Sequence, residues 1–247
     1  MQSKSEEMKN LIIDQGNSSS KVSIFEGDDI LFSQRYEKLT VDDLKGIKEE
    51  QGWEAAILSS VVGEDDVLNE WITIHSDKFV KLDHTTPLPI GNLYKTPNTL
   101  GKDRIAVCVG ANYLQPNQNL LVIDAGTAIT YDIVNAENNY VGGNISLGLD
   151  MRFKALNTFT KKLPLVLKEE EVPLTGRETK EAIVSGVTNG LTYEIDGFID
   201  AYKTTYPKLL VFLTGGNAKY FEKRIKNRTF VVQNLLSIGL NRILCYR

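Results

Sequence analysis

The chain has 247 residues, of which 42% are hydrophobic and 24% are charged, and its formal net charge is −4. This composition is typical of a soluble globular protein with one large domain or two lobes of about 100–150 residues. No apolar run approaches the ~20 residues of a membrane span, and lysine and arginine are dispersed, so neither a membrane nor a nucleic acid is an expected partner. Residues 1–9 form a polar tail without the apolar core of a signal peptide, which predicts a cytoplasmic protein.

Two segments share one pattern, an apolar run that ends in Asp-x-Gly and continues into polar donors. Their aspartates, Asp14 and Asp124, are 124 − 14 = 110 positions apart, nearly half the chain. In each segment the glycine lets backbone N–H groups approach an anion, and the carboxylate can hold a cation. A plain hairpin with a solvated aspartate has the same local sequence. The duplication favours two lobes, residues 10–115 and 116–247, with the turns on either side of one cleft.

Other elements follow from apolar periodicity and from helix caps. A strand after each turn covers Lys21 to Phe25 and Ile129 to Val134, and the first three-stranded unit ends near Tyr36. We then expect a helix capped by Thr40, a core strand from Trp53 to Ser60, a helix from Val67 to Ser76, a strand from Phe79 to Leu82 and a long loop from Asp83 to Pro97.

Cysteines and histidines give no sign of a metal site. Cys108 and Cys245 lie in apolar contexts without metal-ligand spacing, which predicts buried thiols. His75 and His84 are the only histidines and have no partner ligands nearby, so packing at the surface or in a loop is the default interpretation.

An acidic and a basic residue stand side by side where the long loop leads into a helix, predicted from Ile105 to Leu114. Asp103 alone would be explained as a helix N-cap, but capping does not explain Arg104. Together the two side chains offer a base and an anion clamp at a helix start, where the dipole already favours anions.

A second long helix is expected from Glu178 to about Tyr202. Asp196 and Asp200 share one of its faces, which we interpret as solvated. Ala182, Gly186 and Gly190 form a stripe of small residues, which fits either a partner helix or another element of the same lobe.

Six segments then occur in order within residues 11 to 239: Asp14-Gln15-Gly16-Asn17-Ser18, Tyr94 to Arg104, Asp124-Ala125-Gly126-Thr127-Ala128, Gly142 to Met151, Thr179 to Gly186 and Thr214-Gly215-Gly216-Asn217-Ala218. In order and spacing they resemble the type III pantothenate kinases of bacteria. Two positions depart from that family, which usually has threonine at Ser18 and proline at Leu147. Serine keeps the hydroxyl donor, and losing the proline frees the backbone without removing a chemical group.

The resemblance implies an α/β fold of two duplicated lobes of the actin-like ATPase (ribonuclease H-like) type, with mixed sheets flanked by helices. This is the fold of the acetate and sugar kinase, heat-shock protein 70 and actin superfamily. The implied reaction is ATP-dependent phosphorylation of pantothenate to 4'-phosphopantothenate, the first step of coenzyme A biosynthesis. A homodimer with shared active sites is also implied.

Residue roles carry over from the same resemblance. Asp103 would be the general base, Asp124 would hold a monovalent cation (K⁺ or NH₄⁺), and Mg²⁺ would accompany ATP. The implied ATP contacts are Asp14, Gln15, Gly16, Asn17, Ser18, Ser19, Ser20, Lys21, Thr127, Gly215 and Gly216. The implied pantothenate contacts are Tyr94, Gly101, Lys102, Asp103 and Arg104, with Thr179 supplied by the neighbouring protomer.

Two alternatives remain open on sequence grounds. One is another small-molecule kinase of the superfamily, acting on a sugar or a short acid, against which the Gly-x-Asp-Arg block at Gly101 to Arg104 argues. The other is a non-catalytic ATP-binding regulator or actin-like assembly protein. The presence of Asp103 argues against that second alternative.

Overall fold

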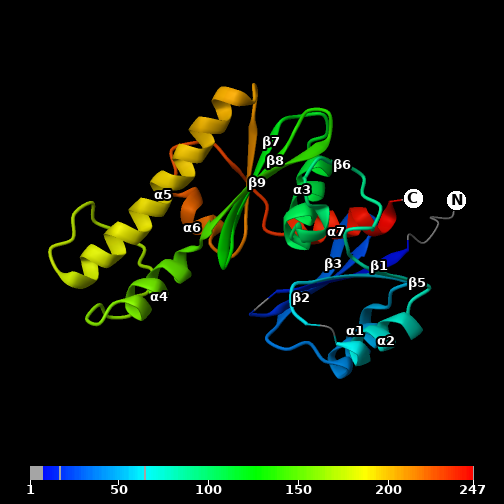
Figure 1. Ribbon diagram of the computed structural model, residues 1–247. Coiled ribbons are helices and arrows are strands. Elements are labelled where there is room, and N and C mark those ends of the chain that lie inside the picture. Colours follow the sequence, from blue (N-terminus) through cyan, green and yellow to red (C-terminus); the bar gives the residue numbers. More distant parts are fainter. Residues whose placement is uncertain (1–7, 17, 64, 247) are drawn as a thin grey trace, which may run out of the picture. The chain divides into compact units, whose positions relative to one another are not determined.

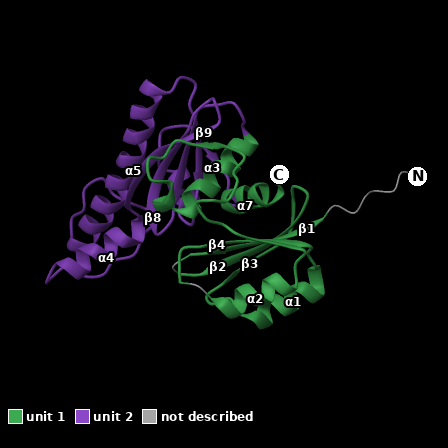
Figure 2. Ribbon diagram, turned by 45° about the vertical axis from the view of Figure 1, so that its right-hand side comes forward, with its two compact units in different colours: residues 1–114, 235–247 green, residues 115–234 purple. Residues whose placement is uncertain are grey.

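The chain divides into two compact units. Figure 1 shows a computed structural model of the protein, which describes residues 8–16, 18–63 and 65–246. One unit contains residues 1–114 together with 235–247, and the other contains residues 115–234 (Figure 2). The sequence predicts a boundary at residue 115 as well, but it assigns residues 235–247 to the second lobe, whereas the structure groups them with the first.

The first unit contains a five-stranded sheet, helices and one short strand, β6, which is not part of this sheet. Its elements are β1 (Lys9–Gln15), β2 (Ser20–Glu26), β3 (Asp29–Tyr36), α1 (Val41–Gln51), β4 (Ala55–Ser60), α2 (Asp66–Ile74), β5 (Lys78–Lys81), β6 (Gly91–Asn92), the 3₁₀ turn η1 (Pro97–Thr99), α3 (Lys102–Leu114) and α7 (Leu235–Cys245). The strands are ordered β3-β2-β1-β4-β5. The first three strands in the chain form an antiparallel meander, and β4 and β5 run parallel to β1.

Both faces of this sheet are covered, which explains the apolar run in β1. Leu11 and Ile13 are buried against residues of α1 and α2. On the opposite face the Asn10 amide donates a hydrogen bond to Asn241 Oδ1 of α7 at 2.8 Å. Side chains alternate between the faces of a strand, so even-numbered residues of β1 lie on the α7 side.

Helix α7 belongs to the first unit because its backbone packs directly on α3. A Cβ atom at Gly239 would lie 1.8 Å from the carbonyl oxygen of Ala106, so only glycine fits this crossing. Gly110 of α3 approaches Leu235 of α7 in the same way. The helix therefore completes the core of a unit whose other elements are 120 or more residues earlier in the chain.

The second unit repeats the first sheet. Its elements are β7 (Leu120–Ala125), β8 (Ala128–Val134), β9 (Asn139–Leu147), α4 (Leu149–Phe159), α5 (Thr179–Thr205), β10 (Leu210–Thr214), α6 (Ala218–Glu222) and β11 (Phe230–Val231). Its strands are ordered β11-β10-β7-β8-β9, with an antiparallel meander from β7 to β9 and with β10 and β11 parallel to β7. The order and directions of these strands, starting from β9, match those of the first sheet starting from β3. The repeated Asp-x-Gly pattern predicts such a match between the two units.

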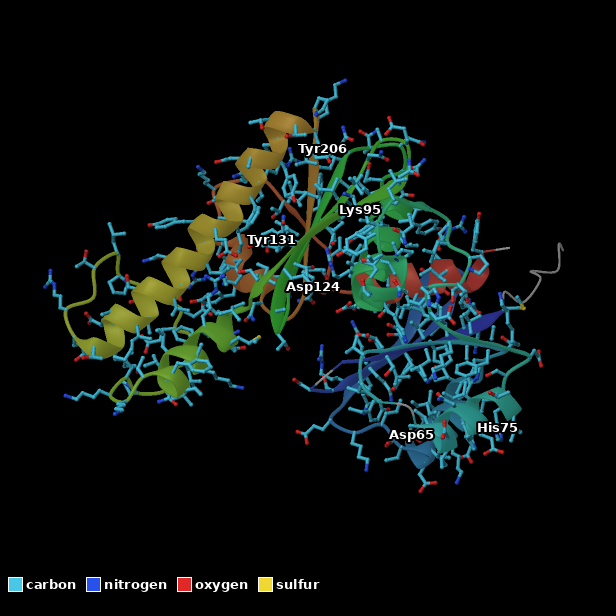
Figure 3. The ribbon with its side chains drawn as sticks, in the orientation of Figure 1. Asp65, His75, Lys95, Asp124, Tyr131 and Tyr206 are labelled. Atoms are coloured by element: carbon cyan, nitrogen blue, oxygen red, sulfur yellow. The ribbon has the colours of Figure 1, made fainter. Side chains whose placement is uncertain are left out.

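A partly buried polar cluster fixes α5 on the second sheet. Glu194 accepts a hydrogen bond from the hydroxyl of Tyr131 at 3.0 Å, and it pairs with Arg152 of α4 at 2.6 Å. Figure 3 labels Tyr131, next to α5 in the view. Breaking such a pair would leave a partly buried charge without its partner, so the cluster sets the orientation of the helix.

Most elements predicted from sequence are present, with boundary shifts. Thr40 forms a capping box with Asp43 at the start of α1. Helix α3 begins three residues earlier than predicted, because the first helical hydrogen bond runs from Ile105 N–H to Gly101 O. His75 stacks on the Trp71 ring at 4.0 Å, in agreement with the packing role expected for it (Figure 3).

Two predictions about single residues were wrong. Cys245 is exposed rather than buried, since it lies at the end of α7, whereas Cys108 is buried as expected. Asp196 is buried rather than solvated, because its carboxylate accepts hydrogen bonds from the backbone N–H groups of Lys226 and Asn227. Asp200 is exposed, as predicted for that face. Among the described residues, no helix has both the length and the apolar character needed to cross a bilayer.

Candidate functional site

The turn between β1 and β2 is the first of the two Asp-x-Gly turns. The N–H of Gly16 donates to Ser19 O at 3.0 Å and closes the turn. Ser18 is exposed, Ser19 is half-buried, and Ser20 is buried at the start of β2. Asn17, one of the predicted ATP contacts, lies outside the described residues. The turn thus presents hydroxyl groups and backbone directly after the buried strand, while Gln15 stays buried within it.

Asp14 lies one residue before Gln15, in an environment that disfavours its charge. It pairs across the strands with Lys21 of β2 and with Ser59 of β4. Burial, together with the negative charge of Asp103, raises the pKa of Asp14 to about 6, although the charges of Lys21 and Arg35 oppose the shift. Asp103 is therefore close enough to Asp14 for the two carboxylates to interact.

The start of α3 holds the predicted pantothenate contacts together. Asp103 accepts a hydrogen bond from the N–H of Arg104 at 2.8 Å. The Arg104 side chain is buried, and its guanidinium carbon lies 5.9 Å from the centre of the Tyr94 ring. Gly101 and Lys102 are half-buried at the first turn. A carboxylate, a guanidinium and an aromatic ring thus share one helix start, so capping by Asp103 is not the whole explanation.

The second unit gathers its own set of predicted residues around Asp124. A Cβ atom at Gly215 would lie 2.3 Å from Asp124 Oδ1, and Gly215 has a φ of +91°, so glycine is required on both counts. Gly216 is exposed beside it, in the turn from β10 into α6. A Cβ atom at Gly148 would meet the carbonyl oxygen of Thr127 at 2.1 Å. The turns after β7, β9 and β10 therefore meet around one carboxylate, which Figure 3 labels.

Two buried hydroxyl groups next to these aspartates have no hydrogen-bond partner among the described residues. Ser59 lies opposite Asp14 on β4, and Thr130 lies opposite Asp124 on β8. An unsatisfied buried hydroxyl costs about 1–3 kcal/mol, so a partner is expected when the site is filled. Carboxylate and hydroxyl oxygens are the donor types that K⁺ and Mg²⁺ prefer, so both positions fit such cations. The described residues contain no group of three or more His, Cys, Asp or Glu side chains that could hold a metal alone.

Thr179 is the one predicted site residue of the second unit that lies apart from the Asp124 turn. It begins α5 and lines a groove of about 840 Å³ between α4 and α5, which lie side by side (Figure 1). The groove is mostly apolar, and its wall includes Ala182, Gly186 and Phe159. A Cβ atom at Gly186 or Gly190 would meet no atom within 4 Å. No described element of the chain therefore fills this part of the small-residue stripe.

One charged residue near the first turn was missed by sequence reasoning. Arg35 of β3 donates a hydrogen bond from Nη1 to Ser19 Oγ at 2.7 Å. It lies opposite Lys21 in the sheet and influences the pKa of Asp14. The only signal in the sequence is a basic residue in a predicted strand, which by itself indicates nothing about the turn.

Comparison with known proteins identifies close relatives. The family model described as type III pantothenate kinase matches residues 10–201. A type III pantothenate kinase from Phocaeicola vulgatus is 44% identical over 237 residues, which cover 96% of this chain and 98% of that protein. Among solved structures, a Baf family protein from Campylobacter jejuni has a TM-score of 0.62 at 22% identity, covering 94% of this chain and 96% of that one.

The solved structures also establish the fold class. A polyphosphate/ATP-glucomannokinase from an Arthrobacter strain has a TM-score of 0.50 at 13% identity and covers 94% of this chain and 96% of its own. At such low identity the likeness shows the fold alone. Together with the repeated sheet topology, it confirms the expected α/β fold of the actin-like ATPase and sugar kinase type.

Asp14→Asn should stabilise the fold at high pH. Because burial raises the pKa of Asp14 from 3.8 to about 6, the ionised carboxylate destabilises the folded state above pH 6, and this penalty vanishes below pH 3.8. A shift of about two units corresponds to at most about 3 kcal/mol. We expect the variant to unfold at higher urea concentration than the wild type at pH 8 and at about the same concentration at pH 4. An equal gain at both pH values would contradict this explanation.

Proposed function

Because the chain belongs to the type III pantothenate kinase family, we propose that it transfers the γ-phosphate of ATP to the primary hydroxyl of pantothenate. This is the first step of coenzyme A biosynthesis. The observation that carries the proposal is the position of Asp103, which lies at the start of α3 within electrostatic range of Asp14 and the β1–β2 turn. A base for the acceptor and a turn for the phosphates are thereby held in one unit.

The residues of the first unit divide into two roles. The Gly16 turn and Lys21 hold phosphate oxygens, while Arg104 and Tyr94 hold pantothenate, whose carboxylate suits a guanidinium. Asp103 accepts the hydroxyl proton as the new oxygen–phosphorus bond forms and the bond to the β-phosphate oxygen breaks. Phosphoryl transfer depends mainly on positioning and charge neutralisation, which these groups supply.

The second unit supplies further contacts to the nucleotide. Thr127 and the turn at Gly215 and Gly216 bind ATP, and Asp124 with the Thr130 hydroxyl holds a monovalent cation, K⁺ or NH₄⁺. In the first unit, Asp14 and the Ser59 hydroxyl offer oxygen ligands for Mg²⁺. When bound, these cations neutralise charge on the phosphate oxygens.

The groove between α4 and α5 binds a second copy of the chain in this proposal. Its apolar wall and the open stripe at Gly186 and Gly190 allow close approach of another helix, which supports a homodimer. Thr179, in the same wall, would then reach pantothenate bound to the neighbouring protomer. The proposed compartment is the cytoplasm, and neither nucleic acid nor a membrane is part of the function.

Asp103→Asn should abolish most of the activity. A positioned general base contributes about 10²–10⁴-fold, so kcat should fall by that order while the urea unfolding midpoint stays unchanged. The measurement is ADP release coupled to NADH oxidation, with and without pantothenate. Wild-type ADP release that does not depend on pantothenate would refute the proposed function, and a fall in kcat below about threefold would refute the role of Asp103.

Activity should rise when Na⁺ is replaced by K⁺ or NH₄⁺ at constant ionic strength. If Asp124 holds the cation, Asp124→Ala should remove this response as well as lower the rate, since the neighbouring hydroxyl of Thr130 cannot replace a carboxylate. The same coupled assay in three chloride salts measures the effect. Equal wild-type rates in all three would exclude a cation role for Asp124.

Two inactive variants should restore activity when they are expressed together. Asp103→Asn and Thr179→Asp chains form mixed dimers in which one shared site carries both changes and the other carries neither. With random pairing, half of the dimers are mixed and each has one intact site, so about a quarter of the wild-type activity should return. Purified co-expressed protein is assayed beside each parent. If each site lies within one chain, no activity is recovered.

A further inference from the structure

Four polar residues form a row across the first sheet. Arg35 of β3 pairs with Lys21 of β2, Lys21 pairs with Asp14 of β1, and Asp14 pairs with Ser59 of β4. Directly paired residues point to the same face of a sheet, so all four side chains lie on one face at one level. This is the face that α7 covers further along β1, and the charge of Asp103, at the start of α3, acts on Asp14.

Two like charges are neighbours in this row. Lys21 and Arg35 are cross-strand partners, and such like-charged pairs destabilise a sheet. The pKa of Lys21 is lowered by burial and by the charge of Arg35, while Asp14 partly offsets both effects. Among the described residues, Arg35 forms no ion pair with a carboxylate, and Asp14 offsets the repulsion only in part. An anion bound at the row would offset it further.

The guanidinium of Arg35 retains donors for such an anion. Its Nη1 donates to Ser19 Oγ in the β1–β2 turn, and the side chain is otherwise exposed. A guanidinium carries five N–H donors in a planar fork, which matches the oxygens of a phosphoryl group. The contact with Ser19 already fixes the side chain beside the turn, so little conformational freedom is lost when it binds.

We propose that Arg35 is a catalytic residue that binds the terminal phosphoryl group of ATP. The proposal rests on the proposed kinase function, in which Asp103 takes the proton from the acceptor hydroxyl. The charge of Asp103 acts on Asp14, so the acceptor hydroxyl that Asp103 would deprotonate lies near this row. The phosphoryl group of ATP nearest to the row is then the one that is transferred to that hydroxyl. Arg35 neutralises negative charge on its non-bridging oxygens and takes part in no bond making or breaking.

The test measures binding of nucleotides that differ only in the terminal phosphate. Wild type, Arg35→Gln and Arg35→Lys are titrated calorimetrically with Mg²⁺ and either ADP or the β,γ-imido analogue of ATP, without pantothenate. Arg35→Gln should bind the triphosphate at least tenfold more weakly and ADP less than threefold more weakly. Arg35→Lys keeps the charge but loses the fork, so its triphosphate affinity should lie between those of Arg35→Gln and the wild type.

Lys38→Gln provides a matched control, because it removes the same charge from an exposed residue just beyond β3. It should bind both nucleotides like the wild type. Equal weakening of ADP and triphosphate in Arg35→Gln would overturn the proposal, since Arg35 would then act on the inner phosphates or only shape the turn. Unchanged triphosphate binding in Arg35→Lys and Arg35→Gln would also overturn it.

A kinetic readout separates this inference from the proposed function. In the pantothenate-dependent assay, Arg35→Gln should lower kcat about 10²-fold, as expected for loss of one preorganised donor, and leave the KM for pantothenate within twofold. Wild-type protein that binds the triphosphate but does not phosphorylate pantothenate would refute the proposed function and leave the binding test of Arg35 valid.

Discussion

A half-buried carboxylate near the end of an apolar strand is the constraint on which both units depend. Three fully buried aliphatic side chains precede Asp14 in β1, and four precede Asp124 in β7. Such strands need cover on both faces, yet the second-to-last residue of each is an aspartate, and burial disfavours the charge of Asp14. Each unit therefore has a closed core at one end of its central strand and an open, polar turn at the other.

Compensation for these charges explains much of the surrounding structure. Around Asp14 the protein places two cations and a second carboxylate, and the two cations are direct cross-strand neighbours. Around Asp124 it places a glycine turn so close that no side chain would fit, together with the Thr130 hydroxyl, which has no hydrogen-bond partner within the described part of the chain. Each arrangement suits the ligands proposed for its own unit, which are phosphate oxygens and a cation.

The fold and most of the candidate site could be predicted from local sequence patterns. Contacts between residues far apart in the chain could not. The two Asp-x-Gly turns are contiguous in sequence, and their repetition gave the two-unit architecture. The position of Arg35 beside Lys21 was not predictable, because the register of the β2–β3 hairpin shifts by one residue between Ile24 and Phe25. Counting back from the tight turn without that shift pairs Lys21 with Gln34 and places Arg35 on the wrong face. Membership of α7 in the first unit depends on contact between two glycines far apart in the chain, for which no local pattern exists.

Because α7 belongs to the first unit but is synthesised last, it affects the order in which the two units can fold on the ribosome. Residues 115–234 are contiguous, so the second unit can fold as soon as they have emerged. The first unit must wait, because the helix that covers the Asn10 face of its sheet is synthesised only after the whole second unit. During that interval apolar surface on β1 and β4 stays exposed to water, and such surface on a nascent chain is prone to aggregation. The unit that is begun first is thus completed last.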